Sequence, residues 1–104
     1  MTLPFACDMT ALPASERGAH HALTRRLMTE ALAELRELPD GLAFRFAADE
    51  FEAVVRFVDR ERLCCPFVRF TLQLAPDRGP IWLRLTGPEG VKAFIRAELQ
   101  LPRV

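Results

Sequence analysis

The chain has 104 residues, of which 50% are hydrophobic and 27% are charged, and its 14 basic side chains balance 14 acidic ones. This length and apolar fraction predict one compact domain with a single core, and they exclude an intrinsically disordered chain. The zero net charge argues against nucleic acid and anionic membranes as partners, because both select a basic excess. We therefore expect neither a nucleic-acid nor a membrane partner.

The N-terminal segment shows no targeting pattern. Residues 1–14 have neither a basic start nor an apolar run long enough for a signal peptide, and no stretch reaches the ~18 apolar residues of a membrane span. We therefore expect a cytoplasmic protein. The same residues contain Pro4 and Pro13 and have no periodicity, which predicts an irregular N-terminal arm on a single domain covering residues 1–104.

The first half of the chain predicts one long helix and one strand. Apolar residues recur at helical spacing over residues 15–38, with charged residues on the other side, and Pro39 and Gly41 then interrupt the pattern. Residues 42–46 instead alternate with period two. We therefore predict an amphipathic helix over 15–38, followed by a strand over 42–46.

The second half predicts a helix, a hairpin and a last helix. The apolar stripe after the first strand is typical of a helix, and Pro66 must end this helix near Leu63 or Cys64. Two alternating segments, residues 67–74 and 81–86, flank a stretch of proline and glycine that suits a tight reversal. A final amphipathic helix, opened by a Gly-Pro pair, completes the chain.

This order of elements predicts the α+β class. An N-terminal helix precedes β-α-β-β-α, which is a split βαβ unit followed by a helix. In such a unit the first two strands run parallel, and the third fits between them antiparallel. We therefore expect a three-stranded sheet, equivalent to a ferredoxin-like unit that lacks its fourth strand.

The strand alternation also predicts which face of the sheet is buried. The apolar face that packs against two helices would consist of Leu42, Phe44, Phe46, Val68, Phe70, Leu72, Leu74, Ile81, Leu83 and Leu85. The opposite face would present Arg45, Phe67, Arg69, Thr71, Gln73, Trp82 and Arg84. We expect either the first helix or a second subunit to cover the apolar part of that face. A homodimer is therefore one expected partner, and a protein-interaction module is one expected function.

The adjacent cysteines Cys64 and Cys65 are the most informative feature of the sequence. Two thiolates this close can share one soft cation such as Hg(II), Cu(I), Zn(II) or As(III). Consecutive side chains diverge on a helix, so the two sulfurs converge only if the helix ends here, as Pro66 predicts. A helix C-terminus also disfavours a thiolate nucleophile, because the helix dipole is negative at that end. The alternative interpretation is two small buried apolar residues.

Cys7 and His20 are further candidate ligands. A hydrophobic arm that folds back over the body would bring Cys7 to the cysteine pair, and three sulfurs would form a trigonal soft-metal site. His20 and His21 point in different directions on the predicted helix, so at most one of them joins a given site. In the structural alternative, Cys7 packs the arm or is exposed, and His20 is exposed or hydrogen-bonded. A reducing compartment favours thiols that are free or metal-bound over disulfides.

Several motifs together resemble those of a group of small bacterial proteins that is largely uncharacterised. The matching residues are Cys7, Arg17 to His20, Glu37 to Gly41, Glu61 to Phe67, and Gly87 to Gly90. The resemblance covers most of the chain, and the double cysteine is its specific element. It implies no settled activity, and it directs attention to the three cysteines and His20 together.

These observations predict a small thiolate-based metal-binding protein for a soft or borderline metal, acting in metal sensing or detoxification. The expected ligands are Cys7, His20, Cys64 and Cys65, and the expected cofactor is an ion of zinc, copper(I), mercury or arsenic, with no organic cofactor. The alternative is a thiol redox protein or enzyme in which Cys64 or Cys65 attacks a substrate or pairs with Cys7. Because His20 is the only evident general base, we expect a non-enzymatic function.

Overall fold

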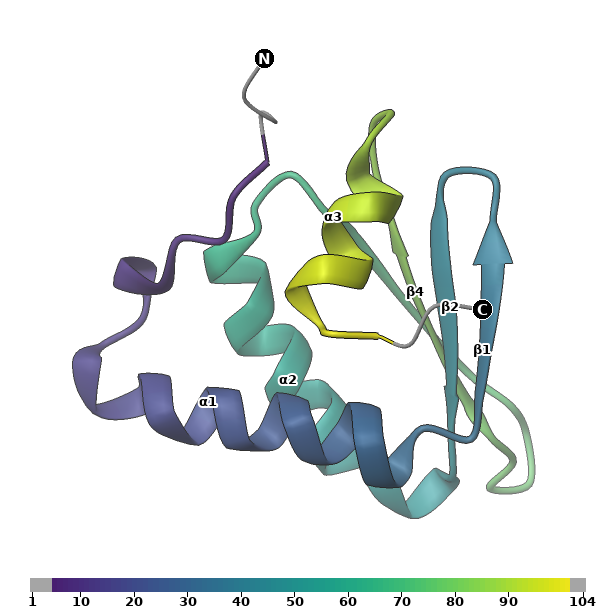
Figure 1. Cartoon of the computed structure of the whole chain (residues 1–104). Helices are drawn as coiled ribbons and strands as arrows, with labels where there is room; N and C mark the ends of the chain where they lie inside the picture. Colours follow the sequence, from purple (N-terminus) through teal and green to yellow (C-terminus); the bar gives the residue numbers. More distant parts are fainter. Residues whose placement is uncertain (1–4, 102–104) are drawn as a thin grey trace.

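The structure is a computed structural model that describes residues 5–101 of the chain. Within these residues, three α-helices lie on one side of a four-stranded antiparallel sheet (Figure 1). The helices are α1 (Ala14–Arg26), α2 (Phe51–Cys64) and α3 (Val91–Glu98). The strands are β1 (Glu34–Leu38), β2 (Gly41–Phe46), β3 (Arg69–Leu74) and β4 (Ile81–Thr86). None of the helices between residues 5 and 101 has the length and apolarity needed to cross a bilayer.

The α+β class is confirmed, and so is the arrangement of the three predicted strands. The strand order is β1-β2-β4-β3, and every neighbouring pair is antiparallel. β4 therefore lies between β2 and β3, which run parallel to each other. The prediction of a three-stranded sheet is wrong, because β1 adds a fourth strand at the outer edge of β2.

β1 forms from residues that the sequence predicted as the end of the first helix. α1 ends at Arg26, a π-helical turn follows over Leu27–Ala31, and the chain then enters β1. The apolar residues of this segment fit helical spacing, but pairing with β2 gives it main-chain hydrogen bonds and places Leu35 opposite Phe44. The predicted helix over residues 15–38 is therefore wrong beyond residue 31.

A glycine that follows the turn between β1 and β2 allows β2 to approach β4 closely. Leu38 pairs with Gly41 across a two-residue turn. A Cβ atom added at Gly41 would lie 1.9 Å from the carbonyl oxygen of Leu85 on β4, so only glycine fits this close approach of two strands. The residues that interrupt the helical pattern in the sequence thus form a hairpin turn.

The buried face of the sheet is mostly the predicted one. The buried residues of that set are Leu42, Phe44, Phe46, Val68, Ile81, Leu83 and Leu85, and Phe70 is half-buried. The prediction is wrong for Leu72 and Leu74, which are 36% and 55% exposed. Both belong to the edge strand β3, whereas α3 packs over β2 and β4. The edge strand keeps its alternation beyond Phe70, but the apolar side chains there remain in solvent.

Phe67 lies with the helices rather than on the opposite face of the sheet. Its ring centre is 4.7 Å from that of Phe5 in the arm and 5.1 Å from that of Phe94 in α3. The predicted placement was wrong because Phe67 precedes the first residue of β3 and is not yet part of its alternation. The three rings attach the arm to the body of the domain.

None of the described helices packs on the opposite face of the sheet. α1 packs against α2, so the prediction that the first helix covers this face is wrong. Trp82 is half-buried nonetheless, because the guanidinium of Arg36 lies 4.8 Å from the centre of its ring. A second subunit on this face stays a prediction.

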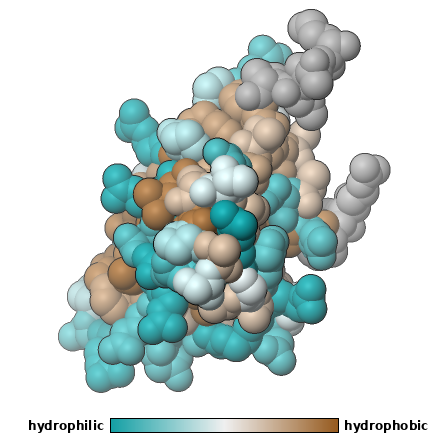
Figure 2. All heavy atoms as spheres, turned by 90° about the vertical axis from the view of Figure 1, so that its left-hand side faces the viewer, coloured by the Kyte–Doolittle hydropathy of each residue, from teal (hydrophilic) through white to brown (hydrophobic). Residues whose placement is uncertain are grey.

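The helix side of the molecule also has an exposed apolar surface. Figure 2 shows apolar atoms at the surface of this side between hydrophilic borders. The exposed large hydrophobic residues among those described are Phe51, Val55 and Leu63 on α2, and Leu72 and Leu74 on β3. The amphipathic pattern of α2 therefore does not bury all of its apolar residues.

Candidate metal centre

The arm is fixed to the C-terminal end of α2 by its main chain. The backbone N–H of Asp8 donates to the carbonyl oxygen of Cys64 over 3.0 Å. This carbonyl is one of the last four of α2, which have no partner inside the helix. The bond satisfies it and places Cys7 directly beside the end of α2.

α1 holds the arm from the other side. The side-chain Nε of Arg17 donates to the carbonyl oxygens of Met9 and Leu12, over 2.9 and 3.2 Å. Leu12 is itself buried in the core. The backbone on both sides of Met9 is therefore held, and Cys7 is kept close to the cysteines of α2.

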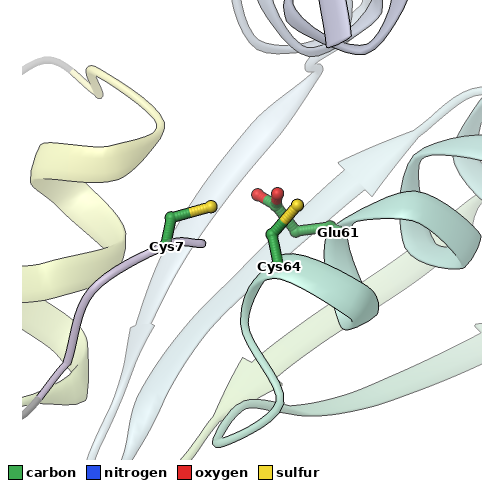
Figure 3. A group of neighbouring side chains, drawn as sticks. All are labelled: Cys7, Glu61 and Cys64. Carbon is green, nitrogen blue, oxygen red and sulfur yellow. The ribbon is translucent and has the colours of Figure 1, made fainter. Parts of the chain in front are cut away.

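Three potential ligand atoms converge where the arm meets α2. One ligand atom each of Cys7, Glu61 and Cys64 lies within 4.8 Å of the other two, and Figure 3 shows Cys7 on the arm reaching toward the pair on α2. Glu61 and Cys64 are three residues apart on the helix, so their side chains share one face. Both are buried, and Cys7 is half-buried.

A thioether completes a triangle of sulfurs. The Sδ atom of Met9 lies 3.8 Å from the Sγ of Cys7 and 3.8 Å from the Sγ of Cys64. Each thiol is therefore in contact with the same methionine. The cluster contains two thiols, one thioether and one carboxyl group, contributed by the arm and α2.

His20 lies behind the carboxyl group of Glu61 rather than among the sulfurs. Its Nε2 is 3.0 Å from Oε1 of Glu61, both side chains are buried, and the imidazole stacks on Phe57 with 5.8 Å between ring centres. Its Nδ1 is buried and has no hydrogen-bond partner among the described residues. His20 therefore orients Glu61, and it is placed one contact away from the sulfur cluster.

Cys65 occupies a different position from its neighbour. It follows the last residue of α2, its backbone N–H donates to the carbonyl of Glu61 over 2.8 Å, and its side chain is buried. It lines a small cavity of about 10 Å³ together with Glu61 and Glu98. Its thiol is the largest cause of the raised pKa of Cys7, but it is outside the group whose ligand atoms are all mutually close.

Burial and neighbouring groups keep the thiols of the cluster protonated. The pKa of the Cys64 thiol is raised to about 12, first by desolvation and then by the nearby Cys7, Glu61 and Glu98. The pKa of Cys7 is raised far above its usual range, chiefly by its contact with Cys65 and then by burial and Glu98. The cluster therefore holds protons that a bound cation would displace.

Sequence reasoning missed two members of the cluster. Glu61 had a usable signal, because it stands three residues before Cys64 on the same predicted helix. Met9 had none beyond its closeness to Cys7, since its position depends on the path of the arm. Of the four ligands predicted, the structure brings Cys7 and Cys64 together, leaves Cys65 beside Cys7, and places His20 on Glu61.

The fold and the cluster together define an α+β domain with a buried thiol and carboxyl site. Comparison of the chain with protein-family models, with characterised proteins and with solved structures gave no match. The functional argument therefore rests on the chemistry and the geometry of the residues described above.

Proposed function

We propose that this protein binds a soft or borderline metal ion through the thiolates of Cys7 and Cys64, with the carboxylate of Glu61 as a third ligand. The observation behind the proposal is the mutual approach of these three ligand atoms, all within 4.8 Å. Thiolates select zinc, copper(I), mercury(II) or arsenic(III) over hard cations such as Mg²⁺ or Ca²⁺. The protein would act in metal sensing or detoxification.

The surroundings of the cluster fit a metal site. His20 hydrogen-bonds to Glu61, as residues behind a ligand do when they fix its orientation. The adjacent cavity of about 10 Å³ has room for a single water molecule and excludes an organic ligand. The raised pKa values of Cys7 and Cys64 mean that ion binding releases protons, so metal affinity should rise with pH.

The same observations disfavour a catalytic thiol. A nucleophilic cysteine needs a lowered pKa, which a positive neighbour or a helix N-terminus supplies. Here the pKa values of Cys7 and Cys64 are raised, and Cys64 ends its helix. One observation does favour a redox role, namely that the sulfurs of Cys7 and Cys64 are close enough for a disulfide to form after a small movement.

The test is metal titration of the reduced protein under anaerobic conditions. We expect one equivalent of Co(II), Zn(II) or Cu(I) to bind, with a thiolate-to-metal absorption band for Co(II) and Cu(I). Cys7→Ser and Cys64→Ser should each lose this band while the metal-free protein stays folded, because a hydroxyl is a poor ligand for these ions. Cys65→Ser is the matched control, and it should retain the band.

Two results would contradict the proposal. One is the absence of bound metal and of any absorption band with all three ions. The other is an intact band in the Cys7→Ser, Cys64→Ser double variant. A different result would support the redox role instead. Mild oxidation of the metal-free protein would form a Cys7–Cys64 disulfide reversibly at cellular potentials, and the re-reduced protein would still take up metal.

A further inference from the structure

We infer that the site binds Cu(I) with Met9, rather than Glu61, as the third ligand beside Cys7 and Cys64. This inference rests on the proposed metal-binding function and specifies the ligand set for one of its candidate ions. It starts from the contacts of Met9, whose Sδ is 3.8 Å from each of the two thiol sulfurs. Thioether and thiolate sulfur together are the donor set that favours Cu(I).

The spacing of the sulfurs suits a shared ion. Sulfur ligands lie about 2.3 Å from a metal, so two of them on one ion are separated by roughly 4 Å in a trigonal site. The two contacts of Met9 have nearly this length, so an ion could enter after only a slight outward movement of the side chains. The backbone of Met9 is already held by Arg17, and the adjacent Asp8 is bound to the end of α2.

Charge decides between Met9 and Glu61 as the third ligand. Two thiolates around a monovalent ion already leave a net negative charge in a buried site. A carboxylate ligand from Glu61 would add another, which is costly where water is excluded, whereas a thioether adds none. His20 also holds the Glu61 carboxyl by a hydrogen bond on the side of α1.

A divalent ion reverses this preference. Zn(II) and Co(II) carry a second positive charge, which a carboxylate offsets, and they accept oxygen ligands readily. The two thiols therefore belong to two overlapping ligand sets, one completed by Met9 for Cu(I) and one completed by Glu61 for divalent ions. This overlap makes the inference testable with a pair of substitutions.

The experiment measures two affinities for the wild-type protein and three variants. Cu(I) affinity is measured by competition with a chromophoric Cu(I) chelator, and Co(II) affinity by titration of the charge-transfer band. We expect Met9→Leu to lower Cu(I) affinity about tenfold or more while changing Co(II) affinity little. Glu61→Gln should instead lower Co(II) affinity and change Cu(I) affinity little. Met28→Leu is the matched control, because Met28 is buried in the hydrophobic core and should affect neither ion.

A second measurement detects the ligand directly in the wild-type protein. In selenomethionine-labelled protein loaded with Cu(I), X-ray absorption at the selenium edge should detect copper at bonding distance. That signal should survive Met28→Leu and vanish in Met9→Leu. It keeps the test decisive even if Met9→Leu destabilises the arm.

The outcomes separate the inference from the function on which it rests. Unchanged Cu(I) affinity in Met9→Leu would overturn the role of Met9 as a ligand. An equal loss for both ions, combined with no copper neighbour at selenium, would show that Met9 only packs the arm. A selenium spectrum without a copper neighbour would also overturn the role of Met9 as a ligand. Failure of the wild-type protein to bind either ion would instead overturn the proposed function itself.

Discussion

The sheet core and the sulfur cluster are both buried, but different forces hold them together. Phe44, Phe46 and Leu83 are fully buried and belong to strands that pair with one another, so their neighbours follow from the register of the sheet. The cluster around Cys64 instead joins the arm and α2, and His20 of α1 is hydrogen-bonded to it. The sheet core is apolar, whereas the cluster buries the carboxyl group of Glu61 together with the imidazole of the adjacent His20.

This difference matters for stability. Burial of an apolar side chain is favourable in itself, at roughly 25 cal/mol per Å² of surface removed from water. Burial of Glu61 and His20 is unfavourable unless each finds a partner, and replacing such a pair by apolar residues is often neutral or stabilising. Packing alone therefore does not account for the choice of residues in the cluster, which suits a functional site.

The largest expected loss of stability comes from a cavity in the sheet core. Phe44→Ala should lower the free energy of unfolding by about 3–5 kcal/mol, because it removes a fully buried ring and leaves a cavity. Leu74→Ala is the control on the same sheet, and since Leu74 is 55% exposed it should cost far less. Urea denaturation of both variants measures the difference, and similar losses would mean that β3 is more deeply packed than described.

The core was also the more predictable region. The alternation of large apolar residues in β2 and β4 marked Phe44 and Leu83 correctly, because the period of a strand depends on local sequence alone. β1 escaped prediction because Leu35 and its apolar neighbours fit helical spacing, and only pairing with β2 decides for a strand. Leu72 and Leu74 escaped for a related reason, since alternation does not show which strand is at an edge.

The cluster was less predictable because its members are far apart in the chain. Adjacent cysteines before a proline marked the end of α2 correctly. The approach of Cys7 depends on the hydrogen bond from Asp8 to Cys64, and the position of Met9 depends on that same path of the arm. His20 was expected beside sulfur, but it pairs with Glu61 because α1 crosses α2 at that level.

An intermediate loss of unfolding free energy is expected when one partner of the buried pair His20 and Glu61 is replaced. In metal-free protein, His20→Leu and Glu61→Met should each cost about 1–3 kcal/mol of unfolding free energy, because the remaining polar group stays buried without its partner. The double variant should regain much of this loss, since both polar groups are then gone. Urea denaturation of the four proteins in a double-mutant cycle measures the coupling.

Additive losses in that cycle would show that the contact between His20 and Glu61 contributes little. The comparison between the two buried regions would then have to be restated, with the cluster behaving as ordinary core. A control pair such as Phe44→Ala with Glu61→Met, whose members belong to different regions, should give additive losses.

The smallest expected effect is a pH dependence that belongs to the cluster alone. The ordinary pKa of a cysteine thiol is 9.0. In the folded protein the pKa of Cys64 is raised to about 12, first by burial and then by Cys7 and the carboxyl groups of Glu61 and Glu98. Between these values the unfolded chain releases the thiol proton while the folded chain keeps it, so rising pH favours unfolding. The stabilising contribution is thus complete below pH 9 and is lost progressively toward pH 12.

Wild-type protein should lose thermal stability more steeply than Cys64→Ala from pH 8 to 10.5. Phe44→Leu should retain the wild-type slope, because the sheet core contains no titrating group, and equal slopes in wild type and Cys64→Ala would show that the Cys64 thiol titrates alike in both states.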